Sequence, residues 1–147
     1  MTAKDYLLQI PALRNRIATA ECRIDDFLTE ACRSTSRLTA VNYGGTDRHS
    51  RVETFVCRSI DEEREDLWPM REALWRLERE AMRVIGAMPD GRWGQVLEMR
   101  YVRGWKWGRI AQEMGITKQY VLMLHGHALI VFAKINNACK CTGVFLS

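Results

Sequence analysis

Three consecutive polar residues, Thr117, Lys118 and Gln119, carry side chains that are suited to binding nucleic acid. A lysine ammonium donates hydrogen bonds to guanine, a glutamine amide pairs with adenine, and a threonine hydroxyl can contact either base. Two cations upstream, Lys106 and Arg109, are suited to phosphate. If a helix begins after Thr117, we expect Lys118 and Gln119 to leave its first turn and reach base edges, while the upstream pair meets the backbone of the duplex.

The stretch from residue 105 to residue 133 has the pattern of two helices joined by a tight turn. Gly115 can end the first helix by adopting positive φ, and Thr117 can cap the second. Apolar residues recur at steps of three and four and face one another across the turn: Ile110, Ala111 and Met114 in the first helix, and Val121, Leu124 and Ala128 in the second. This spacing predicts a helix-turn-helix whose second helix enters a major groove.

The middle of the second helix is occupied by Leu122 and Met123, which cannot hydrogen-bond a base edge. Either they contact thymine methyl groups, or they contact a protein. The predicted DNA-binding residues are Lys106, Arg109, Thr117, Lys118, Gln119, Tyr120, Leu122 and Met123.

Catalytic chemistry finds little support in the sequence. His125 and His127 lie on the last predicted helix, where a histidine next to Leu124 is more often packed than a general base. The Cys139 and Cys141 pair, combined with these histidines, matches no structural-zinc spacing. No glycine-rich phosphate loop, catalytic triad or paired-carboxylate motif is present. We therefore expect no enzyme activity, no cofactor and no metal.

The composition is that of a water-soluble protein: of 147 residues, 47% are hydrophobic and 27% charged. No apolar run approaches the roughly 20 residues of a membrane span, and the first residues lack a signal-peptide pattern. The five cysteines are scattered, so we expect reduced thiols. We expect a cytoplasmic protein with no membrane contact.

The net charge of +4 is unevenly distributed along the chain. Residues 59–88 carry five arginines against eight acids, whereas residues 89–147 carry eight lysines and arginines against three acids. The basic part is therefore the part with the helix-turn-helix pattern, and a surface that binds phosphates requires such an asymmetry. A basic patch without a nucleic-acid partner is the alternative.

Two long apolar seams precede the helix-turn-helix pattern. Residues 6–31 and 56–88 carry apolar residues at alternating steps of four and three, with Glu63 as the one polar member of the second seam. Each seam can bury itself on the other or on a second copy of the chain, and we expect a homodimer. The predicted dimer-interface residues are Ile10, Leu13, Ile17, Ile24, Leu67, Met70, Leu74 and Leu77. Trp68 and Trp75 lie seven residues apart beside the second seam and would widen the contact.

The predicted fold is all-α: a long antiparallel helical hairpin followed by a small helix-turn-helix domain. Residues 1–88 would form the hairpin as a dimerisation arm, with a flexible Ser/Thr/Gly-rich loop at about 34–51. Pro89, Asp90 and Gly91 break the helix and start the domain at residues 89–135. The last residues, 136–147, lose the helical period and are expected to form a mobile tail.

The run L-E-M-R-Y-V-R-G-W-K-W-G-R-I-A-Q-E-M-G resembles region four of sigma factors and their phage relatives, the ArpU-like transcriptional regulators. The opening Y-L-L-Q-I-P-A-L-R-N-R-I, the Ser/Thr-rich stretch and L-H-G-H-A-L resemble small proteins of bacteriophages and prophages of Gram-positive bacteria. The similarity covers most of residues 4–133. It implies a regulator of phage transcription, acting in a bacterial host cell.

Two functions follow from these observations. The first is sequence-specific binding of double-stranded DNA by a helical dimer that controls transcription. The second is an adaptor or anti-activator that binds host RNA polymerase through Leu122 and Met123, since region four of sigma factors also engages the polymerase. The salt dependence of binding distinguishes the two functions, because DNA binding weakens steeply as the salt concentration rises and an apolar protein contact does not.

Overall fold

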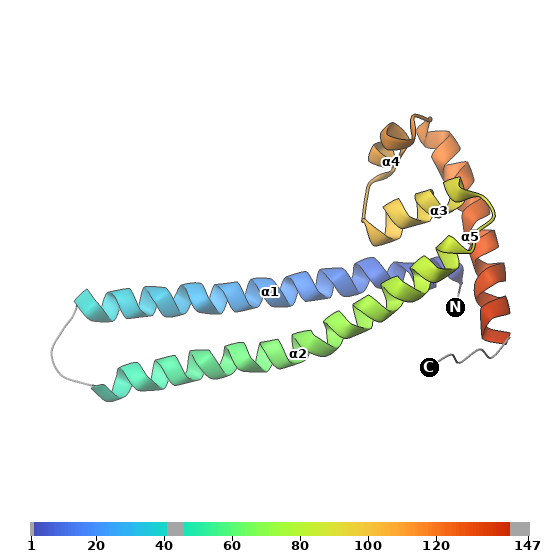
Figure 1. The fold of residues 1–147 in the computed structure, drawn as a ribbon. Helices are drawn as coiled ribbons and strands as arrows, with labels where there is room; N and C mark the ends of the chain where they lie inside the picture. Colours follow the sequence, from blue (N-terminus) through green and yellow to red (C-terminus); the bar gives the residue numbers. More distant parts are fainter. Residues whose placement is uncertain (1, 41–45, 142–147) are drawn as a thin grey trace. The chain divides into compact units, whose positions relative to one another are not determined.

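The computed structural model describes the backbone of residues 2–40 and 46–141, and the side chains of these residues except 34–53 and 139–141. All regular structure in this part of the chain is helical, so the predicted all-α class is confirmed. The helices, in chain order, are α1 Ala3–Ala40, α2 Thr46–Gly86, α3 Gly91–Leu97, the π-helix η1 Glu98–Val102, α4 Trp107–Met114 and α5 Lys118–Cys141 (Figure 1).

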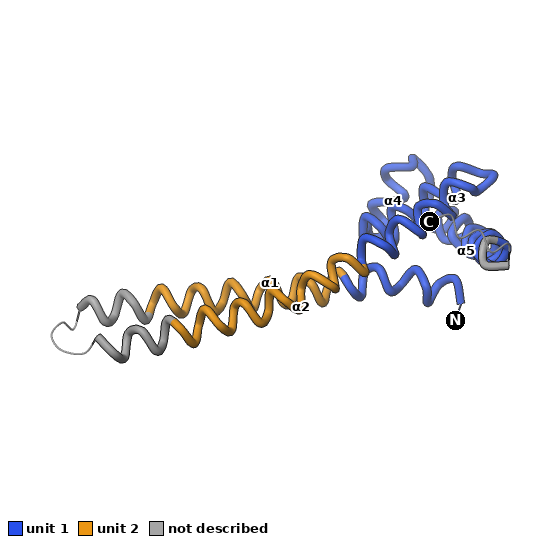
Figure 2. The backbone as a smooth tube through the Cα atoms, turned by 60° about the horizontal axis from the view of Figure 1, so that its bottom comes forward, with its two compact units in different colours: residues 1–13, 74–147 blue, residues 14–73 orange. Residues whose placement is uncertain are grey.

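The chain divides into two compact units (Figure 2). Unit 1 contains residues 1–13 and 74–147, and unit 2 contains residues 14–73. This division differs from the boundary expected after residue 88. The last turns of α2 carry apolar side chains that belong to the same core as α5, so residues 74–88 are grouped with the C-terminal helices.

Unit 2 is an antiparallel pair formed by the middle of α1 and the first part of α2, which run side by side in both views (Figures 1 and 2). Ile17 and Ile24 are buried on α1, and Leu67 is buried on α2. Glu63, the polar residue of the second seam, is only 23% exposed and pairs with Arg23 at 3.4 Å. The ion pair gives this carboxylate a partner, so the seam tolerates it.

The eight residues predicted to join two copies are largely used within one chain. Ile10, Ile17, Ile24 and Leu67 are buried, and the other four are half-buried: Leu13, Met70, Leu74 and Leu77. The apolar spacing of the seams allowed either a contact within one chain or a contact between two copies. In the structure, the buried seam residues are covered by other parts of the same chain. The four half-buried side chains keep some exposed surface, and the homodimer stays a prediction.

Unit 1 encloses an apolar core built from four segments of the chain. Its largest fully buried side chains include Leu7 and Ile10 from α1, Val84 from α2, Leu97 from α3 and Phe132 from α5. The buried residues of this core are Tyr6, Leu7, Ile10, Ala81, Val84, Ile85, Met88, Leu97, Tyr101, Ala128 and Phe132. Burial of this set explains why segments far apart in the sequence form one unit.

Two segments are more helical than the sequence indicated. The loop expected at about 34–51 is shorter, because α1 continues to Ala40 and α2 begins at Thr46; the residues between them lie outside the described part. The tail expected at 136–147 is helical as far as Cys141, and residues 136–142 contain no glycine or proline that would end the helix earlier. Asn136 is buried, so the extension begins against the core; residues 142–147 are not described.

Candidate nucleic-acid interface

The turn between α4 and α5 is closed by backbone hydrogen bonds. Gly115 adopts the left-handed conformation, with φ 64° and ψ 30°, and its amide donates to the carbonyl of Gln112 at 3.3 Å. The amide of Ile116 donates to the carbonyl of Ala111 at 3.0 Å. These two bonds satisfy carbonyls that the end of α4 would otherwise leave free. The predicted role of Gly115 as the helix stop is confirmed.

Thr117 caps the second helix as predicted. Its Oγ1 accepts a hydrogen bond from the amide of Tyr120 at 3.3 Å, and its carbonyl accepts from the amide of Val121 at 3.0 Å. The cap satisfies one of the free donors of the first turn and fixes where α5 begins. Lys118 is consequently the first residue of the helix and Gln119 the second.

A small core holds α4 and α5 against α3. Its buried members are Val96 from α3, Ile110 and Ala111 from α4, and Val121 and Leu124 from α5. Four of these five are the residues whose spacing predicted two facing helices. Ala128, predicted for the same face, belongs to the larger core of unit 1 because it packs in the cluster that contains Phe132.

The polar residues predicted to contact DNA are exposed on this scaffold. Lys106 occupies the N-cap position of α4 and Arg109 lies in its first turn. Thr117, Lys118, Gln119 and Tyr120 follow one another at the start of α5, and all four are exposed. The fold therefore presents two sets of polar side chains, one at the start of each helix.

Leu122 and Met123 are the apolar members of the predicted surface. Their exposed fractions are 44% and 49%, so neither belongs to the core of α3, α4 and α5. The sequence left open whether they meet DNA or a protein, and their exposure is compatible with both.

Stacked arginine and tryptophan side chains surround the start of α4, and the sequence reasoning missed them. The Arg109 guanidinium lies 4.0 Å from the ring centroid of Trp105, and the Arg103 guanidinium lies 5.5 Å from the same centroid. Arg100 lies over the Trp107 ring at 4.5 Å and donates to the carbonyl of Trp105 at 3.0 Å. Stacking of this kind limits the freedom of a guanidinium without removing its charge. The signal in the sequence was the pair of tryptophans among basic residues.

His125 is a packed residue, as its position next to Leu124 indicated. Its Nε2 and the hydroxyl of Tyr101 share a hydrogen bond of 2.9 Å, and the edge of Trp107 packs against its ring at a centroid distance of 4.8 Å. Burial lowers the pKa of His125, and the positive charges of Lys4 and Arg100 lower it further. The imidazole is therefore mainly neutral at pH 7, and it joins α5 to η1.

The part of the chain that the structure describes contains no group of three or more metal-ligating side chains. Cys22, Cys32 and Cys57 are exposed and form no disulfide within the described residues, while the side chains of Cys139 and Cys141 lie outside them. Within residues 2–40 and 46–141, none of the helices combines the length and hydropathy that a membrane crossing requires.

No protein-family model matches this chain, and neither the curated proteins nor the solved structures contain a significant match. The likeness to ArpU-like regulators and to region four of sigma factors therefore rests on the residues quoted above.

Two glycines should respond in opposite directions to alanine. Gly115→Ala should lower the free energy of unfolding by about 1 kcal/mol, because alanine is strained at positive φ even though its Cβ meets open space. Gly126→Ala should raise it by a similar amount, because Gly126 is exposed inside α5 and its added Cβ also meets open space. Denaturant titrations followed by circular dichroism measure both. Equal effects on the two variants would contradict the left-handed turn.

Proposed function

We propose that this protein is a sequence-specific DNA-binding regulator of transcription, in which α4 and α5 act as a helix-turn-helix. The observation that carries the proposal is the exposure of Lys118 and Gln119 in a first turn whose start is fixed by the Thr117 cap. The N-terminal end of the second helix is the part that enters a major groove in helix-turn-helix proteins. It carries hydrogen-bonding side chains here.

The proposed base contacts follow from the chemistry of the first turn of α5. Lys118 is suited to the acceptors of guanine and Gln119 to the donor and acceptor of adenine. Thr117 already accepts the amide of Tyr120 through its oxygen, and its hydroxyl proton can still be donated. Thr117 therefore supports a phosphate or base contact without giving up its cap.

The proposed phosphate contacts come from the start of α4. Arg109 is held by the face of Trp105, so less of its side-chain freedom is lost when it binds a phosphate. Lys106 lies three residues before it, at the N-cap position of α4. The excess of basic residues in 89–147 favours the same interaction, because it attracts the phosphate backbone.

The resemblance to ArpU-like proteins adds the biological setting of the proposal. It implies a regulator encoded by a phage or prophage that acts in the cytoplasm of a bacterial host. The proposed partner is double-stranded DNA, bound by a homodimer. The proposal requires no cofactor and no catalytic step.

A second candidate function rests on the exposure of Leu122 and Met123. Two neighbouring apolar side chains on a helix surface are suited to a protein contact. In this alternative the protein is an adaptor or anti-activator that binds RNA polymerase. Binding assays with RNA polymerase and with DNA separate the two functions. If Leu122→Ala or Met123→Ala abolishes binding to RNA polymerase, while alanine variants of the polar residues leave DNA binding unchanged, the adaptor function is correct and the DNA-binding proposal is wrong.

Arg109→Ala tests the phosphate contact. The variant should bind both specific and random duplexes more weakly, and the slope of log K against log salt should flatten by about one, because one counterion-releasing contact is lost. Binding would be measured by fluorescence anisotropy at several salt concentrations, with duplexes from the DNA that flanks the gene and with random duplexes.

Arg58→Ala is the matched control for Arg109→Ala. Arg58 is an exposed arginine of unit 2 that pairs with Glu62, so its removal changes the net charge equally. Its salt slope should equal that of the parent protein. The same loss of slope in both variants would mean that net charge, and not a phosphate contact at α4, governs binding.

A further inference from the structure

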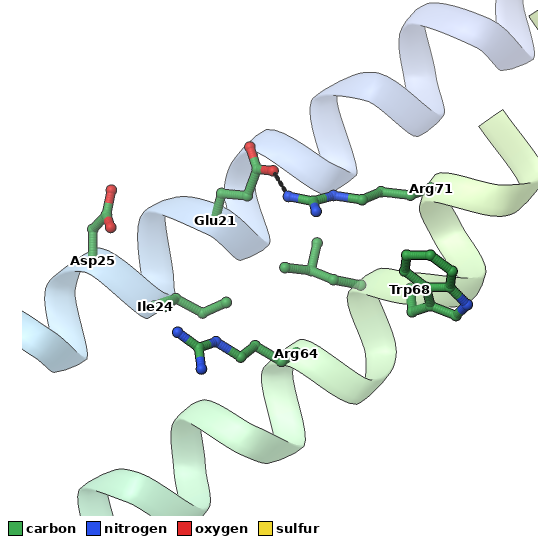
Figure 3. Close-up of a pocket in the computed structure, with 7 residues that line it drawn as sticks. Glu21, Ile24, Asp25, Arg64, Trp68 and Arg71 are labelled. Atoms are coloured by element: carbon green, nitrogen blue, oxygen red, sulfur yellow. Dashed lines mark hydrogen bonds and ion pairs between the residues drawn. The ribbon is translucent and has the colours of Figure 1, made fainter. Parts of the chain in front are cut away.

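An open hollow of about 350 Å³ lies between α1 and α2 in unit 2 (Figure 3). Its floor contains Ile24 and Leu67, both buried. Trp68 lines it from α2 and is 72% exposed. A large apolar ring therefore stands beside an apolar depression that leaves it mostly uncovered. Tryptophan is one of the residue types enriched among the side chains that contribute most to binding at the centre of protein interfaces.

Charged side chains around the hollow are sorted by helix. Glu21 and Asp25 come from α1, whereas Arg64 and Arg71 come from α2 (Figure 3). Glu21 and Arg71 form an ion pair with each other. Asp25 and Arg64 form no ion pair with any residue that the structure describes. Among the described residues, the Asp25 carboxylate on the α1 side and the Arg64 guanidinium on the α2 side are thus both without an ion-pair partner.

This arrangement is self-complementary. If two copies face each other about a two-fold axis that runs along the groove, α1 of each copy lies opposite α2 of the other. Asp25 of each copy then faces Arg64 of the other, and Trp68 of each copy faces the Ile24 side of the other hollow. A two-fold contact forms every such pair twice. A partner that is uniformly acidic or uniformly basic would instead place a charge of the same sign opposite either Asp25 or Arg64.

We infer that the Trp68 face of unit 2 is the surface through which two copies of this chain associate, with Trp68 as its apolar centre and Asp25 and Arg64 as its charge pair. Two of the seam residues first expected to join the copies, Ile24 and Leu67, form the floor of this face, and the exposed Trp68 lies beside them. The inference rests on the homodimer of the proposed function and names its surface, but its test uses no DNA, so the two proposals can fail separately. If both hold, one dimer carries two α4–α5 pairs, which raises the affinity for DNA with two half-sites.

Sedimentation equilibrium of the full chain without DNA tests the contact. The parent protein should form a dimer at about 100 µM and dissociate on dilution. Trp68→Ala should raise the dimer dissociation constant by more than about thirtyfold, because truncating one central interface residue has about that effect and the substitution removes the ring from both copies. Because Trp68 is exposed, the helical content should not change.

Phe55→Ala is the matched control. Phe55 is an aromatic residue of α2 with nearly the same exposure, 69%, but it lies thirteen residues away and about 140° around the helix. Its variant should dimerise like the parent. A parent protein that stays monomeric at about 100 µM would overturn the inference. Equal weakening by Trp68→Ala and Phe55→Ala would overturn it as well, because the dimer would then use another face.

Charge reversal provides the second arm of the experiment. Asp25→Arg and Arg64→Asp should each weaken the dimer, because each places like charges opposite one another twice. The double variant should restore the dimer, since it exchanges the two signs. Single reversals without effect would show that these charges do not face each other. If the double variant loses as much dimerisation free energy as the two single variants together, the two charges likewise do not face each other.

Discussion

Replacing both Lys118 and Gln119 by alanine should remove sequence-specific DNA binding and leave most non-specific binding in place. Each base contact is expected to contribute about 1–3 kcal/mol to discrimination against a wrong base. Random duplexes should be bound slightly more weakly, because only the lysine carries a charge and the cations at the start of α4 are intact. Anisotropy titrations on specific and random duplexes, at one fixed salt concentration, give the ratio of the two affinities, which should fall in the double variant.

The control for this pair removes one glutamine and one lysine elsewhere in unit 1. Gln95 is exposed on α3, and Lys134 is exposed on the last part of α5. Gln95→Ala combined with Lys134→Ala should keep the specificity ratio of the parent. If both double variants reduce specific binding equally, the first turn of α5 does not read bases, and the major-groove assignment is wrong.

Phe132→Ala should lower the free energy of unfolding by about 3–5 kcal/mol. The Phe132 ring is fully buried and lies 6.1 Å from the Tyr6 ring between centroids. Its removal loses transfer free energy and leaves a cavity among side chains that come from four segments of the chain, which cannot all move to fill it. Denaturant unfolding monitored by circular dichroism gives the change.

Ile130→Ala is the matched variant for this prediction. Ile130 lies on the same helix two residues earlier and is 56% exposed, so its truncation should change the free energy of unfolding by about 0.5 kcal/mol or less. If Phe132→Ala were as mild as Ile130→Ala, α5 would not be held in the core of unit 1 through this side chain.

The local geometry of α4 and α5 was predictable because its determinants are close in sequence. The left-handed turn at Gly115 and the cap at Thr117 depend on backbone rules that span four or five residues. The burial of Ile110 and Val121 follows from helical spacing. The exposure of Lys118 and Gln119 then follows, since these residues occupy the part of the first turn that the core does not cover.

What covers an apolar seam was not predictable in the same way. Helical periodicity indicates that Ile24 and Leu67 are buried. It does not indicate which segment packs over them, because that depends on contacts between segments far apart in the chain. Both an intramolecular and an intermolecular contact satisfy the pattern. The grouping of residues 74–88 with α5 was missed for the same reason, because Val84 and Phe132 are separated by most of the C-terminal half.

The ends of the long helices were misjudged because serine and threonine were treated as loop residues. Elsewhere in α1 and α2 their hydroxyls donate to carbonyls four residues earlier: Thr19 to Asn15 at 2.9 Å, and Ser59 to Phe55 at 3.0 Å. A hydroxyl that finds such an acceptor does not interrupt a helix. A stretch rich in these residues therefore carries little information on where a helix ends.

The contact between Tyr6 and Phe132 also constrains the order in which the protein can assemble. The two rings are separated by 126 residues, so at a synthesis rate of roughly 5–20 residues per second the first ring waits about 6–25 s for the second. Through that interval Tyr6, Leu7 and Ile10 lack the α5 part of their final cover. Residues 14–73, which form a unit of their own, meet no such delay, and we expect them to pair while the ribosome is still translating α5.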